Sequence, residues 1–314
     1  MGDATSIPAL LRPPRLRPGD RVAVVAPSGP VPADRLEAGV ALLRGWGLDV
    51  VVAPHVSDTH PDLRYLAGED ADRAEDLRAA WCDPSVDAVF CARGGYGAQR
   101  VVDLIDWEAM RAARPKPFVG FSDITALHEA FATELGLATL YGPGAATPAL
   151  LRDRTTRECL RRTLFEPEST RVLTSGTAKP LVPGRAHGVT AGGCLTILAS
   201  GLGTPHTRRR LPGAIWVIED VGEPLYRLDR ALTQLLRSGA VDGVAGVALG
   251  SWSGCGPEDG LRELMLDRLG GLGVPVVWEL GFGHDERQLT VPLGVPAVLD
   301  ADAGTLTLDA PALA

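Results

Sequence analysis

The sequence predicts an α/β protein of two domains, the first of which is a doubly wound sheet covered by helices. Three observations lead to this prediction. The chain has 314 residues, and a domain holds roughly 100–200 residues. Its content of 45% hydrophobic and 22% charged residues is that of an ordinary globular protein. Apolar strand-like runs alternate with helical periodicity over the first 150 residues, as in helix-covered parallel sheets.

The apolar runs of this first region are nearly continuous, which is typical of strands buried on both faces of a sheet. We expect such strands at 21–26, 48–53, 86–91 and 118–121. Apolar residues at helical spacing predict helices between them at 33–46, 69–81 and 98–105. Ligands of such sheets bind at the carboxyl ends of the strands, so the turns after these strands are the expected site.

The character of the sequence changes between residues 150 and 185. A charged helix at 152–164 is followed by a stretch rich in Pro, Ser, Thr and Gly, which indicates a crossing between domains. Beyond it, strands are expected at 214–218, 244–249, 274–279, 289–291, 296–300 and 304–308, with helices at 228–238 and 258–269. We therefore predict a first domain at 1–155, a linker at 156–185 and a second domain at 186–314.

Charge and composition exclude several classes of protein. The net charge of −8 and the pI near 5.3 argue against a nucleic-acid-binding surface, which needs clustered Lys and Arg. No segment reaches the ~18 apolar residues that span a bilayer, and residues 1–20 lack the apolar core of a secretory signal. The five cysteines are odd in number and lack C-x-x-C spacing. We therefore expect a cytoplasmic protein with no disulfide framework, no metal, no cofactor and no membrane partner.

The stretch 118–128 is the strongest candidate for a catalytic element. A short apolar strand ends at Ser122 and a helix follows at once, so the serine stands at the sheet edge beside free helix N–H groups. This arrangement favours a serine nucleophile next to a site for developing negative charge. Two points count against it: Ser is also a preferred helix cap, and Ile124 stands where the G-x-S-x-G elbow has its second glycine.

A glycine-rich turn follows the strand at 86–91. Its glycines at 94, 95 and 97 let the backbone approach a ligand closely, and the N–H of Gly95 is a candidate oxyanion donor. Glycines after a strand also cradle phosphates, but neither G-x-G-x-x-G nor G-K-[ST] is present.

The second half offers candidate partners for Ser122. Glu219 and Asp220 directly follow an apolar strand, and His284 lies in a glycine-framed turn after the strand at 274–279. The other histidines lie in loops, except His128, which lies on the helix after Ser122. Hydrogen-bond reach between nucleophile and base cannot be read from a sequence, so an incidental loop histidine stays an alternative at His284.

Taken together, these motifs resemble the LD-carboxypeptidase family of serine peptidases, whose relatives include the microcin C immunity hydrolases. The matching pieces occur in the family's order and cover nearly the whole chain. They are 19–29, 92–97, 120–125, 141–142, 192–193, 195–196, 218–220 with Glu223, Tyr226, Arg227 and Arg230, then 283–284 and 292–294.

The resemblance implies a triad of Ser122 as nucleophile, His284 as base and Glu219 as the acid that orients it, with Asp220 and Glu223 as alternatives for the acid. It implies an oxyanion hole made by the backbone N–H groups of Gly95 and Asp123. It further implies a flavodoxin-like, or glutamine-amidotransferase-like, N-terminal domain, a swivelling C-terminal β/α domain and a homodimer.

The function implied is that of a metal-free serine carboxypeptidase in peptidoglycan recycling. It would cut the bond between an L-diamino acid and the terminal D-alanine of murein tetrapeptides. An exopeptidase must hold the free carboxylate of its substrate, for which Arg93, Arg227 and Arg230 are candidates. Tyr96 and Glu223 are further expected substrate contacts.

Three alternatives stand beside this hypothesis. An immunity-type hydrolase would cleave peptidyl-aminoacyl-adenylates with the same triad, but that branch tends to carry Asn where Gly97 stands and an aromatic loop that the segment 200–213 lacks. A non-catalytic muropeptide-binding protein would not need Ser122. A cysteine amidotransferase would use Cys91, which lies inside an apolar strand where a buried, inert thiol is expected.

Overall fold

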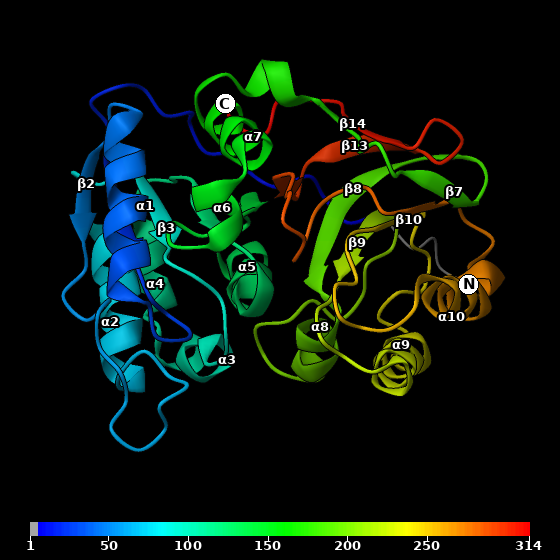
Figure 1. The fold of residues 1–314 in the computed structure, drawn as a ribbon, viewed down its shortest axis with the longest axis horizontal. Coiled ribbons are helices and arrows are strands. Elements are labelled where there is room, and N and C mark those ends of the chain that lie inside the picture. Colours follow the sequence, from blue (N-terminus) through cyan, green and yellow to red (C-terminus); the bar gives the residue numbers. More distant parts are fainter. Residues whose placement is uncertain (1–5) are drawn as a thin grey trace.

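The computed structural model describes residues 6–314, which form two α/β domains side by side (Figure 1). The N-terminal domain holds a mostly parallel sheet of six strands in the order β12-β5-β4-β3-β1-β2. Its strands are β1 (Arg21–Val25), β2 (Asp49–Val52), β3 (Ala88–Cys91), β4 (Phe118–Gly120), β5 (Thr139–Tyr141) and β12 (Val291–Leu293). Its helices are α1 (Ala33–Gly45), α2 (Asp70–Cys82), α3 (Ala98–Val101), α4 (Trp107–Ala112), α5 (Thr125–Ala130), α6 (Pro148–Arg152) and α7 (Arg154–Phe165).

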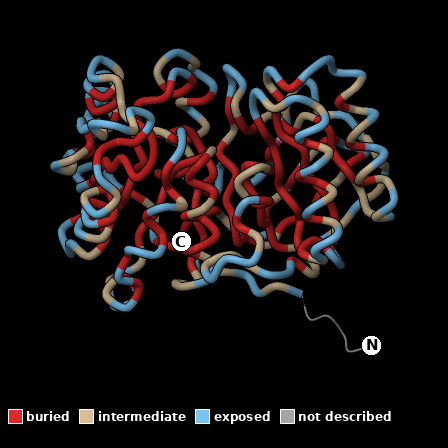
Figure 2. The backbone as a smooth tube through the Cα atoms, turned by 90° about the horizontal axis from the view of Figure 1, so that it is seen from below, coloured by how far each residue is buried: buried red, intermediate tan, exposed pale blue. Residues whose placement is uncertain are grey.

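Both faces of the N-terminal sheet are buried. Side chains of successive strand residues point to opposite faces, so Val22 and Val24 of β1 lie in one apolar cluster and Ala23 and Val25 in another. Helix α1 packs into the first cluster and α2 into the second. This two-sided burial explains the continuous apolar runs of the sequence, and the buried segments of the chain run through the middle of the molecule (Figure 2).

The C-terminal domain is built on a curled, mixed sheet of eight strands in the order β6-β14-β13-β8-β9-β10-β11-β7. The four strands from β8 to β11 in this order are parallel, and the others pair antiparallel. The strands are β6 (Val172–Leu173), β7 (Lys179–Val182), β8 (Arg185–Cys194), β9 (Ala214–Glu219), β10 (Gly246–Leu249), β11 (Val276–Trp278), β13 (Pro296–Asp300) and β14 (Thr305–Leu308). Helices α8 (Leu195–Gly201), α9 (Leu225–Ser238) and α10 (Glu258–Leu269) supply apolar residues to one core cluster with β9 to β11.

The two domains share chain segments. Strand β12 belongs by sequence to the second half but pairs antiparallel with β5 at the edge of the N-terminal sheet. Near the start of the chain, Leu11 bridges to Leu137, and the N–H of Leu10 donates to the carbonyl of Gly294. Within the segment 156–185, β6 and β7 join opposite edges of the C-terminal sheet. The chain therefore crosses between the domains several times.

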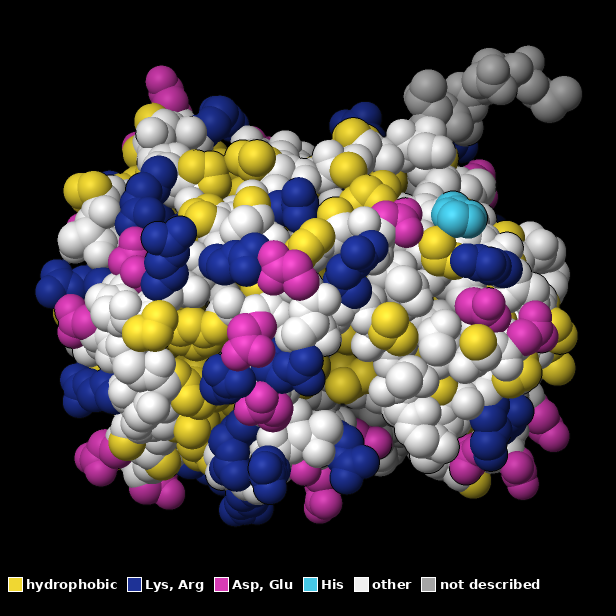
Figure 3. Space-filling view, turned by 90° about the horizontal axis from the view of Figure 1, so that it is seen from above, with side chains coloured by type: hydrophobic (Ala, Val, Ile, Leu, Met, Phe, Trp, Pro, Cys, Tyr) yellow, Lys and Arg dark blue, Asp and Glu magenta, His cyan; other side chains and the backbone are white. Residues whose placement is uncertain are grey.

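Most elements predicted from the sequence are present within a few residues of their expected bounds. The helix expected at 98–105 is shorter, because α3 ends at Val101 and a 3₁₀ turn continues to Leu104. Helices α4, α6 and α8 and strands β5, β6, β7 and β8 were not predicted. Acidic side chains lie among the basic ones over the face in Figure 3. Residues 6–314 contain no helix long and apolar enough to cross a membrane.

Candidate active site

Ser122 stands at a sharp turn between β4 and α5. Its backbone φ of 65° is a left-handed conformation that few residues other than glycine adopt. A single 3₁₀ turn at Ser122–Ile124 leads into α5. Phe121 rather than Ser122 precedes the first helical turn, and no side chain caps it. The hydroxyl of Ser122 is thus free for another partner, and the cap alternative fails.

The glycine turn after β3 packs directly against this serine. A Cβ added to Gly94 would lie 2.7 Å from the Ser122 Cβ and 3.0 Å from its Oγ, so no side chain fits there. The N–H of the next residue, Gly95, donates to no residue of the described chain 6–314. A free N–H beside a serine hydroxyl is what the predicted oxyanion donor requires.

The side chain of Asp123 ties this turn to the elbow. Its buried carboxylate accepts hydrogen bonds from the Ser28 hydroxyl at 2.6 Å and from the Ala98 N–H at 2.7 Å. Burial raises the pKa of Asp123 above its ordinary value, although these hydrogen bonds oppose the rise. Asp123, whose backbone N–H is a predicted oxyanion donor, therefore also connects the loop after β1 to the start of α3, which follows the glycine turn.

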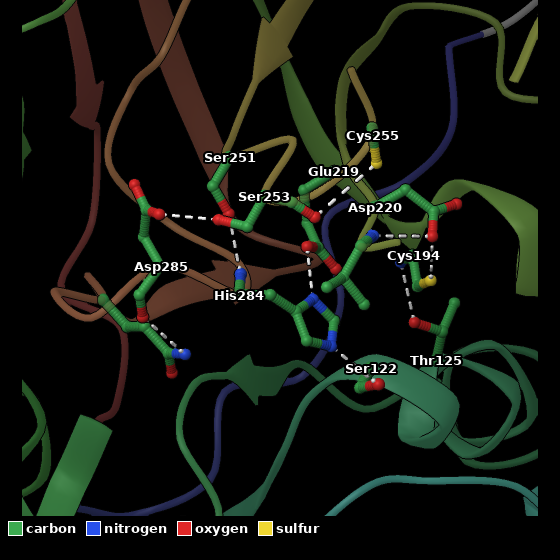
Figure 4. A network of polar contacts seen from close by, with 12 residues as sticks. Ser122, Thr125, Cys194, Glu219, Asp220, Ser251, Ser253, Cys255, His284 and Asp285 are labelled. Atoms are coloured by element: carbon green, nitrogen blue, oxygen red, sulfur yellow. Dashed lines mark hydrogen bonds and ion pairs between the residues drawn. The ribbon is translucent and has the colours of Figure 1, made fainter. Parts of the chain in front are cut away.

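His284 and Glu219 reach Ser122 from the C-terminal domain (Figure 4). Glu219 is the last residue of β9 and is fully buried. The Nδ1 of His284 lies 2.6 Å from Glu219 Oε2, and its Nε2 lies 2.9 Å from Ser122 Oγ. With Nδ1–H donating to the carboxylate, Nε2 is left to accept the serine proton.

The backbone around His284 is shaped to fit this pair. The N–H of His284 donates to Ser251 Oγ at 2.7 Å. Gly283 has φ 109°, and a Cβ added to it would lie 2.6 Å from Glu219 Oε2. Only a glycine lets the histidine loop pass this close to the buried carboxylate.

Two opposing effects act on the pKa of His284. Burial lowers it, but the charge of Glu219 and the hydrogen bond to it, helped by Asp220, raise it above its ordinary value. The carboxylate thus stabilises the imidazolium that forms when the histidine takes a proton.

The other two candidate acids do not contact His284. Asp220 accepts hydrogen bonds from the N–H groups of Thr196 at 2.9 Å and Val221 at 2.8 Å, and burial raises its pKa to about 6. Glu223 lies 3.5 Å from Arg227. Glu219 is therefore the acid that the fold brings to the histidine.

Tyr141, part of the matched pair 141–142, is a site residue whose role was not predicted from the sequence. It ends β5, is buried, and donates its hydroxyl proton to Glu219 Oε1 at 2.5 Å. The same hydroxyl accepts from the Ser122 N–H at 3.1 Å. Burial and then the charge of Glu219 raise the pKa of Tyr141, so the phenol stays protonated as a donor. One side chain thus links the nucleophile's backbone to the orienting acid.

Ser122 and His284 open onto a cavity of about 290 Å³. Among the predicted substrate contacts, Arg93 lines this cavity. Tyr96 is half-exposed against Tyr65 and does not line it, and the pair Glu223–Arg227 lies outside it. Arg230 stands over the Tyr226 ring instead. The cavity also contains Arg35 and Gln288, which were not predicted.

The remaining reactive candidates are buried away from this cavity. His128 is held between Thr139 and the carbonyl of Gly120, and burial lowers its pKa to about 4, so it is neutral. Burial raises the pKa of the Cys91 thiol well above its ordinary value, which makes it inert as a nucleophile. Among residues 6–314 no group of His, Cys, Asp and Glu could hold a metal ion.

Comparison with known proteins agrees with this geometry. Residues 22–142 match the family model of the LD-carboxypeptidase N-terminal domain, and residues 187–299 that of the C-terminal domain. A Streptomyces coelicolor protein named "Putative carboxypeptidase" is 68% identical, over 97% of this chain and 98% of its own. The murein tetrapeptide carboxypeptidase of Pseudomonas aeruginosa is 35% identical, over 90% of this chain and 94% of its own.

Among solved structures, an inactive mutant of the microcin C7 self-immunity protein MccF in the apo state superposes with a TM-score of 0.87. The match covers 98% of this chain and 100% of that chain at 23% identity, a level at which the likeness concerns the fold. The family models and the sequence relatives carry the assignment further: the chain belongs to the LD-carboxypeptidase family, S66, of serine peptidases.

Proposed function

We propose that this protein is a serine LD-carboxypeptidase that releases the terminal D-alanine from murein tetrapeptides during peptidoglycan recycling. The observation that carries the proposal is the continuous chain of contacts from Ser122 Oγ through His284 to Glu219, at the edge of one cavity. The name of the P. aeruginosa relative supports the substrate class.

The proposed reaction follows from the positions of these groups. Ser122 Oγ attacks the carbonyl of the L-diamino acid while His284 Nε2 takes the hydroxyl proton. Glu219 holds the Nδ1–H and stabilises the imidazolium. His284 then gives the proton to the departing amine of D-alanine, which leaves an acyl ester on Ser122. Water, deprotonated by His284, hydrolyses the ester and frees the tripeptide.

The developing oxyanion would lie between the backbone N–H groups of Gly95 and Asp123. In related acyl-transfer sites one such donor contributes roughly 3–4 kcal/mol to the transition state. The packing of Gly94 against Ser122 and the carboxylate brace of Asp123 support a turn that is rigid enough for this role.

The immunity-type hydrolase is less well supported. Its adenine-stacking loop would have to border the catalytic cavity, but no residue of 200–213 lines it. Residues of that segment, including Thr204 and His206, line a separate hollow beside Glu129. A non-catalytic binding protein would have no use for a serine in a left-handed conformation that is hydrogen-bonded to a histidine–carboxylate pair.

The predicted domain limits 1–155, 156–185 and 186–314 belong to the same proposal, as do the flavodoxin-like and swivelling descriptions of the domains, the homodimer and the cytoplasmic location. Light scattering on the purified protein tests the homodimer, for which we expect about twice the chain mass of 33.0 kDa.

The experiment for the reaction is mass-spectrometric. The purified protein is incubated with EDTA and L-Ala–γ-D-Glu–meso-diaminopimelyl–D-Ala, alongside its Ser122→Ala variant. We expect the wild type alone to release one D-alanine. An intact tetrapeptide together with cleavage of an aminoacyl-adenylate analogue would instead favour the immunity-type reaction. Equal D-alanine release by both proteins would exclude Ser122 as the nucleophile.

A further inference from the structure

Two arginines without acidic partners stand in the catalytic cavity. Arg35 comes from α1 and Arg93 follows β3, and both line the cavity beside Ser122. Neither forms an ion pair within residues 6–314. The hydrogen bond of the Arg93 side chain goes to the carbonyl of Pro30 at 3.1 Å. Burial and then the nearby charge of Arg35 lower the pKa of Arg93.

Two well-buried arginines elsewhere in the fold have carboxylate partners. Arg73 is bound to Asp70, and Arg208 to Glu129. Two like charges that share a half-buried wall repel each other unless an anion lies between them. The missing partner of Arg35 and Arg93 is therefore an anion that enters the cavity from outside.

The same cavity is also lined by two acidic residues. Asp285 and Glu286 follow the catalytic histidine and also line the cavity, and Asp285 accepts from Ser253 Oγ at 2.6 Å. A substrate carboxylate is repelled by these acids and attracted by the two arginines. Gln288 also lines the cavity. The charges that line the cavity therefore favour an orientation in which the substrate carboxylate lies at the two arginines.

Arg93 lies beside the expected oxyanion hole. Arg93 Nη2 lies 3.7 Å from the position of a Cβ built on Gly95, so it borders the expected oxyanion donor. In a peptide, the carbon of the terminal carboxylate is three bonds from the carbon of the preceding carbonyl, roughly 3–4 Å. A carboxylate of the leaving residue would therefore lie close to an arginine that borders this donor.

We propose that Arg35 and Arg93 together bind the free α-carboxylate of the leaving C-terminal residue and thereby restrict cleavage to the last peptide bond. This inference rests on the proposed function, and it selects Arg93 over Arg227 and Arg230. It adds Arg35, whose role no motif of the sequence indicates.

The test is calorimetric and uses the Ser122→Ala variant, which binds without turnover. Its affinity is measured for the tetrapeptide with a free terminal carboxylate and for the same peptide as a C-terminal amide. We expect the acid to bind about 10- to 100-fold more tightly, as for a charge-assisted hydrogen-bonded pair. Equal affinities for acid and amide overturn the subsite, and this comparison needs no arginine variant.

Arginine variants in the same background assign the residues. Arg35→Gln and Arg93→Gln should each weaken binding of the acid about tenfold or more, while binding of the amide stays unchanged. Arg44→Gln, on the exposed end of α1, is the matched control and should change neither affinity. If the Arg35→Gln variant does not fold, Arg35→Lys, which retains the charge, takes its place in the measurement. Equal weakening of acid and amide overturns the assignment.

Two further outcomes separate this inference from the proposed function. If the Ser122→Ala protein binds the acid in an arginine-dependent way but the Ser122 enzyme does not cleave it, the subsite stands and the proposed reaction fails. If the Ser122 enzyme removes D-alanine and D-alaninamide equally well, the reaction stands and the subsite fails. Arginine-dependent binding of an aminoacyl sulfamoyl adenosine, with no binding of the tetrapeptide, assigns the anion to a nucleotide and also overturns the subsite.

Discussion

The two domains hold their parts of the site in different ways. The N-terminal domain uses backbone shape: Ser122 in a left-handed turn, with the glycines at 94 and 95 packed against it. The C-terminal domain uses side chains from distant positions, since Glu219 and His284 are 65 residues apart and meet through one hydrogen bond. The first arrangement joins two short turns and tolerates no added side chain at Gly94. The second depends on the register of β9 against its neighbours.

The strongest test of this comparison removes one reacting group from each domain. Ser122→Ala and His284→Ala should each lower kcat by about 10⁴- to 10⁶-fold, because the nucleophile and the base that takes its proton act as one unit. The double variant should be no slower than either single variant. Rates of D-alanine release measure this, with thermal melting as the folding control. If the rate losses of the two single variants multiplied in the double variant, the groups from the two domains would act independently.

Removal of the orienting charge tests the C-terminal side alone. Glu219→Gln should lower kcat about 10⁴-fold, as in other triads that lose the acid. The pKa of His284 is raised in the folded protein, and only the neutral imidazole accepts a proton. The activity of the wild type therefore falls as the pH drops through a value above the ordinary ~6.5. In the variant the effect of burial remains, so this limb of the pH profile should move to lower pH.

The same shift has a consequence for stability. Because the folded pKa of His284 lies above its unfolded value, the pairing with Glu219 stabilises the protein fully below the unfolded pKa. That contribution is lost as the pH rises through the folded pKa. Denaturant titrations across this window should show the loss in the wild type and not in Glu219→Gln. An unchanged pH profile in the variant would contradict the assigned cause of the shift.

A backbone substitution tests the N-terminal side. Gly94→Ala should lower kcat by about 10²- to 10³-fold, because its Cβ would displace the turn that carries one oxyanion donor. Gly45→Ala is the matched control, since no atom lies within 4 Å of its added Cβ. Kinetics on the tetrapeptide should separate the two variants by kcat rather than by KM. Equal activity of both would mean that the turn is not held rigidly.

The smallest effect is expected at Tyr141, which contacts both Ser122 of the N-terminal domain and Glu219 of the C-terminal domain. Tyr141→Phe removes the donor to Glu219 and the acceptor for the Ser122 N–H. We expect a loss of about 1–3 kcal/mol of unfolding free energy from the unsatisfied buried groups and a 10- to 100-fold lower kcat. Urea denaturation and steady-state rates measure both. A loss of stability with full activity would limit Tyr141 to a structural role.

This contrast also explains which features the sequence could predict. The elbow at Ser122 and the glycine turn after β3 are short patterns, so residue order alone indicated them. Glu219 and His284 were recognisable as candidates at strand ends, and their pairing came from the family resemblance. Tyr141 was matched only as part of the pair 141–142, which indicates no role for it, and Arg35 lies on an ordinary amphipathic helix. Their roles exist only through contacts between segments far apart in the chain.

The pairing of β12 with β5 gives the molecule an unusual order of assembly. During synthesis, the first five strands of the N-terminal sheet emerge long before residues 291–293, which close its edge. Until then β5 presents unpaired N–H and C=O groups, the kind of edge that recruits foreign strands. The N-terminal sheet is therefore completed only after residues 291–293 have been synthesised, and its open edge must stay protected from aggregation until then.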